Sequence, residues 1–308
     1  MIALLIILLA ALLVLFCYFM AFYSPSSSRD NHYDLPNGSQ YRENREYMLS
    51  LIRDLEKVPY EDVSITSFDG LRLAGRYYHQ KDGAPVEIEF HGYKGTALRD
   101  FCGGNRIARS MGHNVLLVDQ RSHGRSEGRT ISFGIKERRD VLSWVEYVSG
   151  RFGSDCRIIL SGVSMGAATV LMASGLELPE CVKGIIADCP YSSPEAIIRK
   201  VMDKDMHIPS FLLMPFVRIA ARVIGGFSLR DSSPVSDVER SQVPILLIHG
   251  TDDRFVPCSM SSEIAAHSDK ASLVLFEGAG HGLSFISDEK RYIETVRDFE
   301  ARILSDMD

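Results

Sequence analysis

The stretch RIILSGVSMGAATVLM, residues 157–172, predicts a strand-to-helix turn around which the rest of the chain is organised. Its first part is an apolar run of strand type, and residues 167–173 are good helix formers. Between them stands G-x-S-x-G, centred on Ser164. A serine in a tight, strained turn needs glycine two positions before and after it, because a side chain there would clash. The turn also places the serine at a helix N-terminus, where free N–H groups stabilise negative charge. The pattern is also compatible with a plain small-residue turn, but its strand–turn–helix context favours a nucleophilic serine.

Strand and helix patterns alternate through the chain on both sides of this turn. Residues 63–67 and 71–78 alternate apolar and polar residues around a turn, which predicts an antiparallel hairpin at a sheet edge. Further strands are expected at 86–90, 114–119, 182–187, 244–249 and 272–276, and helices at 97–111, 134–148, 259–267 and 288–304. A hairpin followed by βα repeats predicts an α/β fold with a doubly wound, mostly parallel sheet.

One long segment, residues 191–242, interrupts this alternation between two core strands. Within it, residues 208–227 are strongly apolar but are broken by Pro209, Pro215 and Arg218. A second membrane span is excluded, because it would have to join two strands of one sheet through a bilayer. We therefore expect a small helical cap over the mouth of the site. Packing on the domain is the default use of its apolar face, and lining an acyl pocket or touching lipid is the alternative.

The N-terminal segment differs from the rest of the chain. Residues 2–22 carry no charge over about 30 Å of helix, which matches a bilayer core, and aromatic residues cluster at the exit. A cleaved signal peptide is the alternative, but no Lys or Arg precedes the apolar run and no A-x-A site lies near Ala21. We expect a single-pass, uncleaved anchor over residues 1–23.

The organisation expected after the anchor is a linker followed by one domain. Residues 24–57 comprise a polar tether and a short amphipathic helix, within 41–57, that packs on the domain. Residues 58–308 are long enough for one α/β domain with an ample core, including the cap at 191–242.

Composition excludes several classes of function. The net charge is −6 and there is no basic cluster with interleaved aromatics, so nucleic acid is not an expected partner. Six cysteines occur at no metal-ligand spacing, and H-E-x-x-H, C-x-x-C and P-loop motifs are absent. The predicted chemistry therefore uses neither metal nor cofactor. Scattered, reduced-looking cysteines and Arg29 after the anchor slightly favour a cytosolic domain, although the side of the membrane stays open.

An elbow serine needs a base and an orienting carboxylate later in the chain, each on a loop at the C-terminal end of a strand. The strand ending at His249 is followed by Asp252 and Asp253, and the strand ending at Phe276 is followed by His281. Both the order and the placement fit this requirement, and loops at the carboxyl ends of parallel strands converge on one site.

Taken together, these motifs resemble the α/β-hydrolase superfamily, in the branch of esterase, lysophospholipase-like and serine-aminopeptidase-like hydrolases. The matching pieces are FHGY (90–93), DQRSHGRS (119–126), GVSMG (162–166), HGTDDRFVP (249–257) and GHG (280–282). The resemblance implies an α/β-hydrolase fold from residue 63 to the C-terminus. The family's acid lies four residues after the histidine of H-G-x-x-D, which is Asp253, and Asp252 is the alternative.

By this resemblance Ser164 is the nucleophile, His281 the base and Asp253 the residue that orients it. The resemblance further implies an oxyanion hole made by the backbone N–H groups of Tyr93 and Met165. The histidines at positions 91, 123 and 249 are read as structural.

The expected activity is a membrane-tethered serine hydrolase, carboxylesterase- or lipase-like, that cleaves esters or thioesters through an acyl-enzyme. Its expected partners are a small-molecule or lipid-like acyl ester and the membrane. Two alternatives remain. One is a peptidase of the aminopeptidase-like branch, which an acidic patch in the cap would favour, with Glu195, Asp203 and Asp205 as candidates. The other is a catalytically silent binding module.

Overall fold

The computed structural model describes residues 1–25 and 31–305 and contains an eight-stranded sheet in the order β1-β2-β4-β3-β5-β6-β7-β8. The β1–β2 and β2–β4 pairs are antiparallel and all other neighbours are parallel, which confirms the predicted edge hairpin and the mostly parallel, doubly wound sheet. The strands are β1 (Glu61–Thr66), β2 (Arg72–Tyr78), β3 (Val86–Phe90), β4 (Asn114–Val118), β5 (Ile158–Val163), β6 (Val182–Asp188), β7 (Ile245–Gly250) and β8 (Ala271–Phe276).

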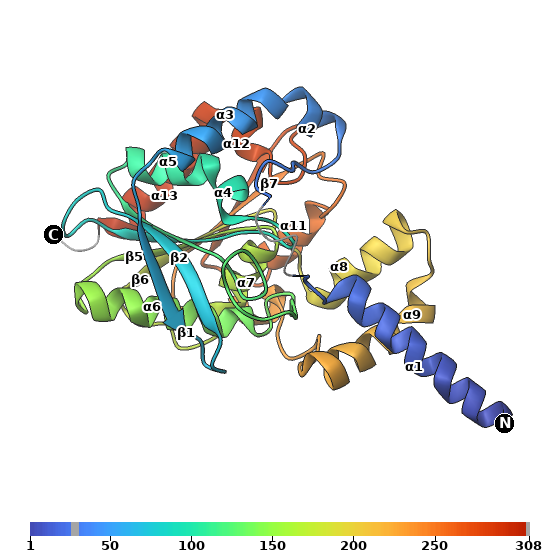
Figure 1. The fold of residues 1–308 in the computed structure, drawn as a ribbon. Helices are drawn as coiled ribbons and strands as arrows, with labels where there is room; N and C mark the ends of the chain where they lie inside the picture. Colours follow the sequence, from blue (N-terminus) through green and yellow to red (C-terminus); the bar gives the residue numbers. More distant parts are fainter. Residues whose placement is uncertain (26–30, 306–308) are drawn as a thin grey trace.

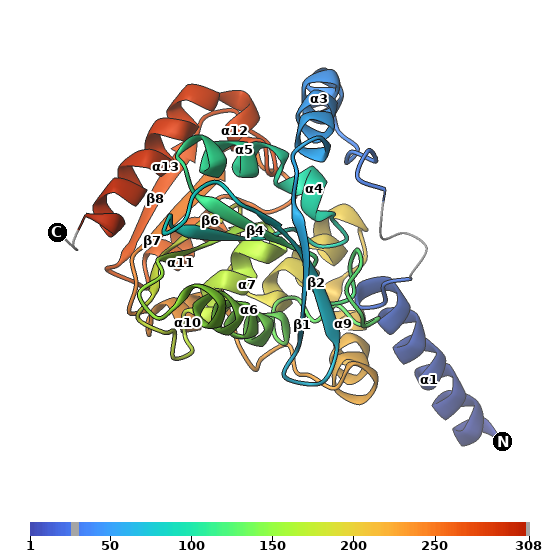
Figure 2. The same ribbon diagram turned by 60° about the vertical axis from the view of Figure 1, so that its left-hand side comes forward.

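Helices cover both faces of this sheet (Figure 2). One face packs against α3 (Arg45–Glu56), α4 (Ala97–Asp100), α5 (Cys102–Ser110), α12 (Ser284–Ser287) and α13 (Glu289–Leu304). The other face packs against α6 (Glu137–Phe152), α7 (Met165–Ala173), α10 (Pro234–Val238) and α11 (Ser259–Ala265). The central strands β3, β4 and β5 are buried along nearly their whole length, as expected for strands covered on both faces.

Three helical patterns differ from their predicted limits. The helix expected at 97–111 divides into α4 and α5 around the buried Phe101, whose backbone leaves the helical region. The helix expected from Gly134 begins only at Glu137, because Gly134 has a positive φ of 87° and the Glu137 carboxylate accepts from its N–H. The helix expected within 41–57 is preceded by a separate short helix, α2 (Ser39–Glu43).

The segment between β6 and β7 forms a helical cap. It contains α8 (Pro194–Lys200), which continues into the π-helical turn η2 (Val201–Asp205), then α9 (Ser210–Ala220) and a second π-helical turn, η3 (Ala221–Gly225). With 11 residues, α9 is about 17 Å long, too short to cross a bilayer. One side of α9 is buried. The apolar side chains of Phe211, Leu212 and Ile219, elsewhere on this helix, are 71%, 52% and 46% exposed.

The N-terminal helix α1 (Ile2–Ala21) is long and apolar enough to cross a membrane. Figure 1 shows it projecting away from the sheet beside α9, with the N-terminus at its far end. Its C-terminal end is part of the domain, since Cys17, Tyr18 and Phe22 are buried. The predicted tether lies partly in residues 26–30, and Arg29 with it, outside the described residues.

A group of buried ionisable side chains lies between the sheet and α13. His113 Nδ1 is 3.9 Å from Glu87 Oε2, and His113 Nε2 is 3.6 Å from Glu300 Oε2. Burial, together with the nearby Glu87 charge, raises the pKa of Glu300 to about 9. The Glu300 carboxyl group is therefore protonated at neutral pH in the folded protein, whereas in the unfolded chain it loses its proton near its ordinary pKa of 4.5.

We expect Glu300→Gln to stabilise the protein, and to do so more at pH 8 than at pH 5. Because the pKa of Glu300 is about 9 in the folded protein and 4.5 in the unfolded chain, the free energy of unfolding falls as the pH rises from 4.5 towards 9. A neutral amide at this position has no such pH dependence. Thermal melting of the full chain in detergent should show the Tm raised by a few degrees at pH 8. Glu294→Gln, on the exposed side of the same helix, is the matched control and should change the free energy of unfolding by less than about 0.5 kcal/mol. A Tm gain that is equal at both pH values would contradict the assignment.

Candidate active site

The turn between β5 and α7 holds Ser164 in a strained conformation, with φ at 55°. Its N–H donates to the carbonyl of Asp188 at 2.8 Å, which fixes the turn to the end of β6. A Cβ atom on Gly166 would lie 1.8 Å from the Phe90 carbonyl oxygen, and one on Gly162 would lie 2.4 Å from the Gly166 backbone. Both glycines are therefore required by close backbone packing, which agrees with the role inferred from the sequence.

The structure brings Ser164, His281 and Asp253 together in one hydrogen-bonded chain. Ser164 Oγ is 2.9 Å from His281 Nε2, and His281 Nδ1 is 2.7 Å from Asp253 Oδ2. Because a carboxylate only accepts hydrogen bonds, Nδ1 carries the proton and Nε2 is free to accept from the serine hydroxyl. This is the geometry that a serine nucleophile and its base need before attack.

Asp253 lies buried in a shell of donors. Its Oδ1 accepts from the N–H groups of Phe255 and Val256, and its Oδ2 lies 3.2 Å from His249 Nε2 as well as bonding His281. Burial alone would raise the pKa of Asp253, but the hydrogen bonds from the two histidines, with the His281 charge, hold it well below its usual range. The carboxylate is therefore ionised across neutral pH and able to stabilise an imidazolium.

The neighbouring Asp252 points elsewhere. Its carboxylate accepts hydrogen bonds from Gln40 Nε2 at 3.2 Å and from Arg254 Nε at 3.2 Å, and it is not among the partners of His281. Of the two candidate acids, Asp253 is the one that bonds the histidine.

The loop after β3 approaches the nucleophile from the other side. A Cβ atom on Gly92 would lie 3.4 Å from Ser164 Cβ, so the backbone that continues into Tyr93 runs beside the serine. The loop is held in place by Asp100, whose Oδ2 accepts from Gly92 N–H at 2.9 Å. Within the described residues, the N–H groups of Tyr93 and Met165 donate no hydrogen bond to the protein, which leaves both available to an oxyanion.

Two further histidines support this loop. His91 Nε2 accepts from Gln120 N–H at 3.1 Å, and His123 Nε2 accepts from Lys94 N–H at 3.1 Å. Their rings pack edge to face with centroids 4.7 Å apart. These contacts agree with the structural role inferred for both histidines from the sequence. His249, which was also expected to be structural, in addition bonds the site residue Asp253.

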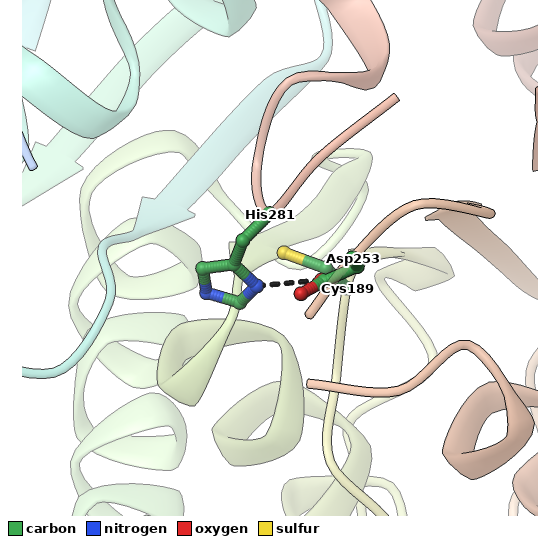
Figure 3. A group of neighbouring side chains, drawn as sticks. All are labelled: Cys189, Asp253 and His281. Carbon is green, nitrogen blue, oxygen red and sulfur yellow. Dashed lines mark hydrogen bonds and ion pairs between the residues drawn. The ribbon is translucent and has the colours of Figure 1, made fainter. Parts of the chain in front are cut away.

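Cys189 lies beside the Asp253–His281 hydrogen bond, as Figure 3 shows, and the three side chains have the donor types of a metal site. The chemistry of the set does not suit a metal. Burial raises the pKa of the Cys189 thiol well above its ordinary value, and metals bind the thiolate. The aspartate and histidine are already engaged with each other and with Ser164.

Asp188 is a site residue that the sequence analysis did not identify. It ends β6, and its side chain lines a cavity of about 350 Å³ that also reaches Ser164 and His281. Burial raises its pKa to about 6, against the attraction of His249 and a hydrogen bond from Tyr292. The only sequence signal was an acidic residue directly after an apolar strand, which is common at strand ends.

A second cavity, of about 290 Å³, also reaches Ser164 and lies between α1 and the cap. Tyr93 and Phe255 line both cavities, so Ser164 stands at the point where they approach each other. Two separate spaces are therefore accessible from Ser164.

Comparisons with known proteins concern the family and the fold of the chain. A family model described as "Alpha/beta hydrolase family" matches residues 90–295. The uncharacterized protein YqkD of Bacillus subtilis is 29% identical over 190 residues, covering 61% of this chain and 62% of that protein. The thiohydrolase aneE of Aspergillus aculeatus is 30% identical over 159 residues, covering 51% and 49%. This chain therefore spans only about half to three-fifths of the length of these two curated relatives.

Among solved structures, the Pyrococcus furiosus esterase Pf2001 superposes with a TM-score of 0.66 at 23% identity, covering 81% of this chain and 93% of that one. At this level of identity the match concerns the fold.

The close packing at the elbow gives a direct test. We expect Gly166→Ala to lower the free energy of unfolding by about 3 kcal/mol or more, because the new methyl group would meet the Phe90 carbonyl, which is backbone and cannot move aside. Gly150→Ala is the matched control: it lies inside α6 with no atom within 4 Å of the new Cβ, and should stabilise by about 0.5–1 kcal/mol. Chemical denaturation of both variants measures the difference, and equal stabilities would show that the elbow has room to relax.

Proposed function

This chain belongs to the alpha/beta hydrolase family, and on that basis we propose that it is a membrane-tethered serine hydrolase of carboxylic esters or thioesters. The observation that carries the proposal is the hydrogen-bonded chain from Ser164 through His281 to Asp253, set at the meeting point of two cavities. One relative is named a thiohydrolase, which supports keeping thioesters beside esters.

The proposed reaction proceeds in two halves through an acyl-enzyme. Ser164 Oγ attacks the acyl carbonyl while His281 Nε2 takes the hydroxyl proton, and the N–H groups of Tyr93 and Met165 bind the oxyanion. Collapse of this intermediate breaks the bond to the alcohol or thiol, which leaves with the proton from His281. Water then attacks the acyl-enzyme by the same route, with His281 as base, and releases the acid.

Membrane tethering rests on α1. Its 20 residues carry no charge and match the thickness of a bilayer core at about 30 Å. A secretory signal sequence would share these properties. The packing of Cys17, Tyr18 and Phe22 into the domain favours a helix that stays attached, because cleavage near Ala21 would remove part of a built core.

The peptidase alternative receives no support from the acidic residues that would have favoured it. Glu195 is engaged by Arg218 and Arg230, at 2.6 and 3.0 Å, and Asp205 by Lys200 at 2.9 Å. The third carboxylate, Asp203, accepts from the N–H of Ser210 at 2.6 Å. Glu195 and Asp205 are thus paired with basic side chains of the cap, Asp203 is hydrogen-bonded by a backbone N–H group, and none of the three is among the residues that line either cavity at Ser164.

The nucleophile is tested by labelling the full chain in detergent with a fluorophosphonate. We expect stoichiometric labelling of the wild type and none of Ser164→Ala, together with turnover of p-nitrophenyl esters that the variant lacks. Amino-acid p-nitroanilides provide the comparison with amides. Absence of labelling in a well-folded wild type would count for the silent binding module, and preference for the anilides would count for the peptidase.

The choice of acid is tested by a pair of neighbouring substitutions. We expect Asp253→Asn to lower kcat by about 10⁴-fold, because an amide neither holds the imidazole in the required tautomer nor stabilises the imidazolium. Asp252→Asn should leave kcat close to that of the wild type, since its carboxylate bonds Gln40 and Arg254. Steady-state ester hydrolysis measures both, and a larger loss in the Asp252 variant would reverse the assignment.

A further inference from the structure

The cavity between α1 and the cap is almost entirely apolar. Its walls are formed by Cys17 and Met20 of α1, by Met202 of η2 and by Val217 of α9, and it ends at Ser164. Among the described residues that line it, Lys94 carries the only formal charge. The Tyr93 hydroxyl donates to the Ala21 carbonyl at 2.8 Å, so this polar group is already satisfied. Such a lining binds a hydrocarbon chain and offers little to a polar ligand.

The end of α1 is fixed firmly enough to serve as a cavity wall. Phe22 is fully buried and packs edge to face on Phe133 and Phe227, with centroids 5.9 and 5.3 Å away. The Tyr18 hydroxyl bonds Thr130 Oγ1 at 2.6 Å, and the Phe22 carbonyl accepts from Ile131 N–H at 2.8 Å. The helix therefore enters the domain as one of its structural elements.

This attachment shortens the part of α1 that lipid can surround. Cys17 is the first buried residue, and the helix before it is exposed or partly buried against the cap, so lipid can reach at most roughly 22 Å of helix (residues 2–16) against a hydrocarbon core of about 30 Å. The accessible part of α1 is thus shorter than the hydrocarbon core is thick, and the two lengths match if the neighbouring surface of the cap also enters the hydrocarbon layer of the bilayer. That surface is suited to it, since the exposed apolar side chains Phe211, Leu212, Ile219, Val223 and Ile224 lie on α9 and η3, and α9 packs directly against α1.

We propose that the membrane-spanning helix forms one wall of an acyl-binding channel, which receives the hydrocarbon chain of a membrane-resident lipid ester or thioester from the bilayer. The acyl chain lies between α1 and the cap with its carbonyl at Ser164. The leaving group occupies the opposite cavity, where Asn37, Arg99 and Asp100 supply polar contacts. This inference rests on the proposed hydrolase function and adds to it the substrate class and the route of entry.

The channel is tested with the full chain reconstituted in phosphatidylcholine nanodiscs. The reagent is a fluorophosphonate whose long alkyl chain ends in a diazirine; it reacts with Ser164 and, on irradiation, crosslinks whatever surrounds the far end of the chain. We expect crosslinks, mapped by mass spectrometry, within residues 16–21 and 201–217. Crosslinks confined to the opposite cavity, at Met48, Phe285 or Ile286, would overturn the channel while leaving the nucleophile in place. Absence of reaction at Ser164 in folded protein would overturn the hydrolase proposal and this inference with it.

A substitution on α1 gives an independent test by kinetics. We expect Cys17→Trp to fill the channel and lower the ratio of kcat/KM for p-nitrophenyl palmitate to that for p-nitrophenyl acetate by about tenfold or more. Ala11→Trp introduces the same side chain at an exposed position of α1 that does not line the cavity, and should leave the ratio unaltered. Equal ratios in the two variants, with melting temperatures that show both to be folded, would contradict a role for α1 in binding the acyl chain.

Discussion

The contact between the Gly166 backbone and the carbonyl oxygen of Phe90 is the constraint on which the site depends. It brings the start of α7 against the end of β3 at a distance that no side chain permits. Ser164 is thereby held at a positive φ on the turn, with its hydroxyl directed to His281. The N–H group of the next residue, Met165, lies in the first turn of α7 and makes no hydrogen bond within the helix. The same contact brings the loop after β3 beside the serine, so one packing contact positions both Ser164 and the backbone N–H groups of the proposed oxyanion hole.

A second close approach sets the acid and the base. A Cβ atom on Gly250 would lie 2.2 Å from the Ala279 carbonyl, so the loops after β7 and β8 are in backbone contact. Asp253 and His281 lie on these two loops, so the backbone contact places them within reach of their hydrogen bond. His249 completes the arrangement: Nε2 faces two acceptors, Asp253 and the Val256 carbonyl, so it carries the proton, and Nδ1 accepts from Ser261. The aspartate is consequently buried and fully hydrogen-bonded as the charged form, which is the form that stabilises an imidazolium.

The sheet, its helices and the order of the site residues could be predicted because each leaves a local pattern. The elbow needs two glycines around Ser164, and Asp253 and His281 each follow an apolar strand. Features created by contact between distant segments left no such pattern. Nothing near Asp188 in the chain reveals that it faces His281, and the helical spacing of residues 97–111 does not show the break that the burial of Phe101 imposes. The apolar run of α1 was recognisable as a span, but its contact with residues 197–217 arises only when the cap folds beside it.

If α1 spans a membrane, as proposed, its attachment also decides how the domain sits on that membrane. A tether of unstructured residues after the span would let the domain rotate freely, whereas a helix whose last turn is core fixes one orientation. The hydrogen bonds of Tyr18 and Tyr93, and the burial of Phe22, attach the end of α1 to the domain. Figure 1 shows α1 beside the cap and pointing away from the sheet. The N-terminal region contacts the site loops a second time at α2, where Gln40 bonds Asp252 and Tyr41 bonds the His281 carbonyl. The end of α1 and the helix α2 therefore both bond loops that surround Ser164, the first through Tyr93 and the second through Asp252 and His281.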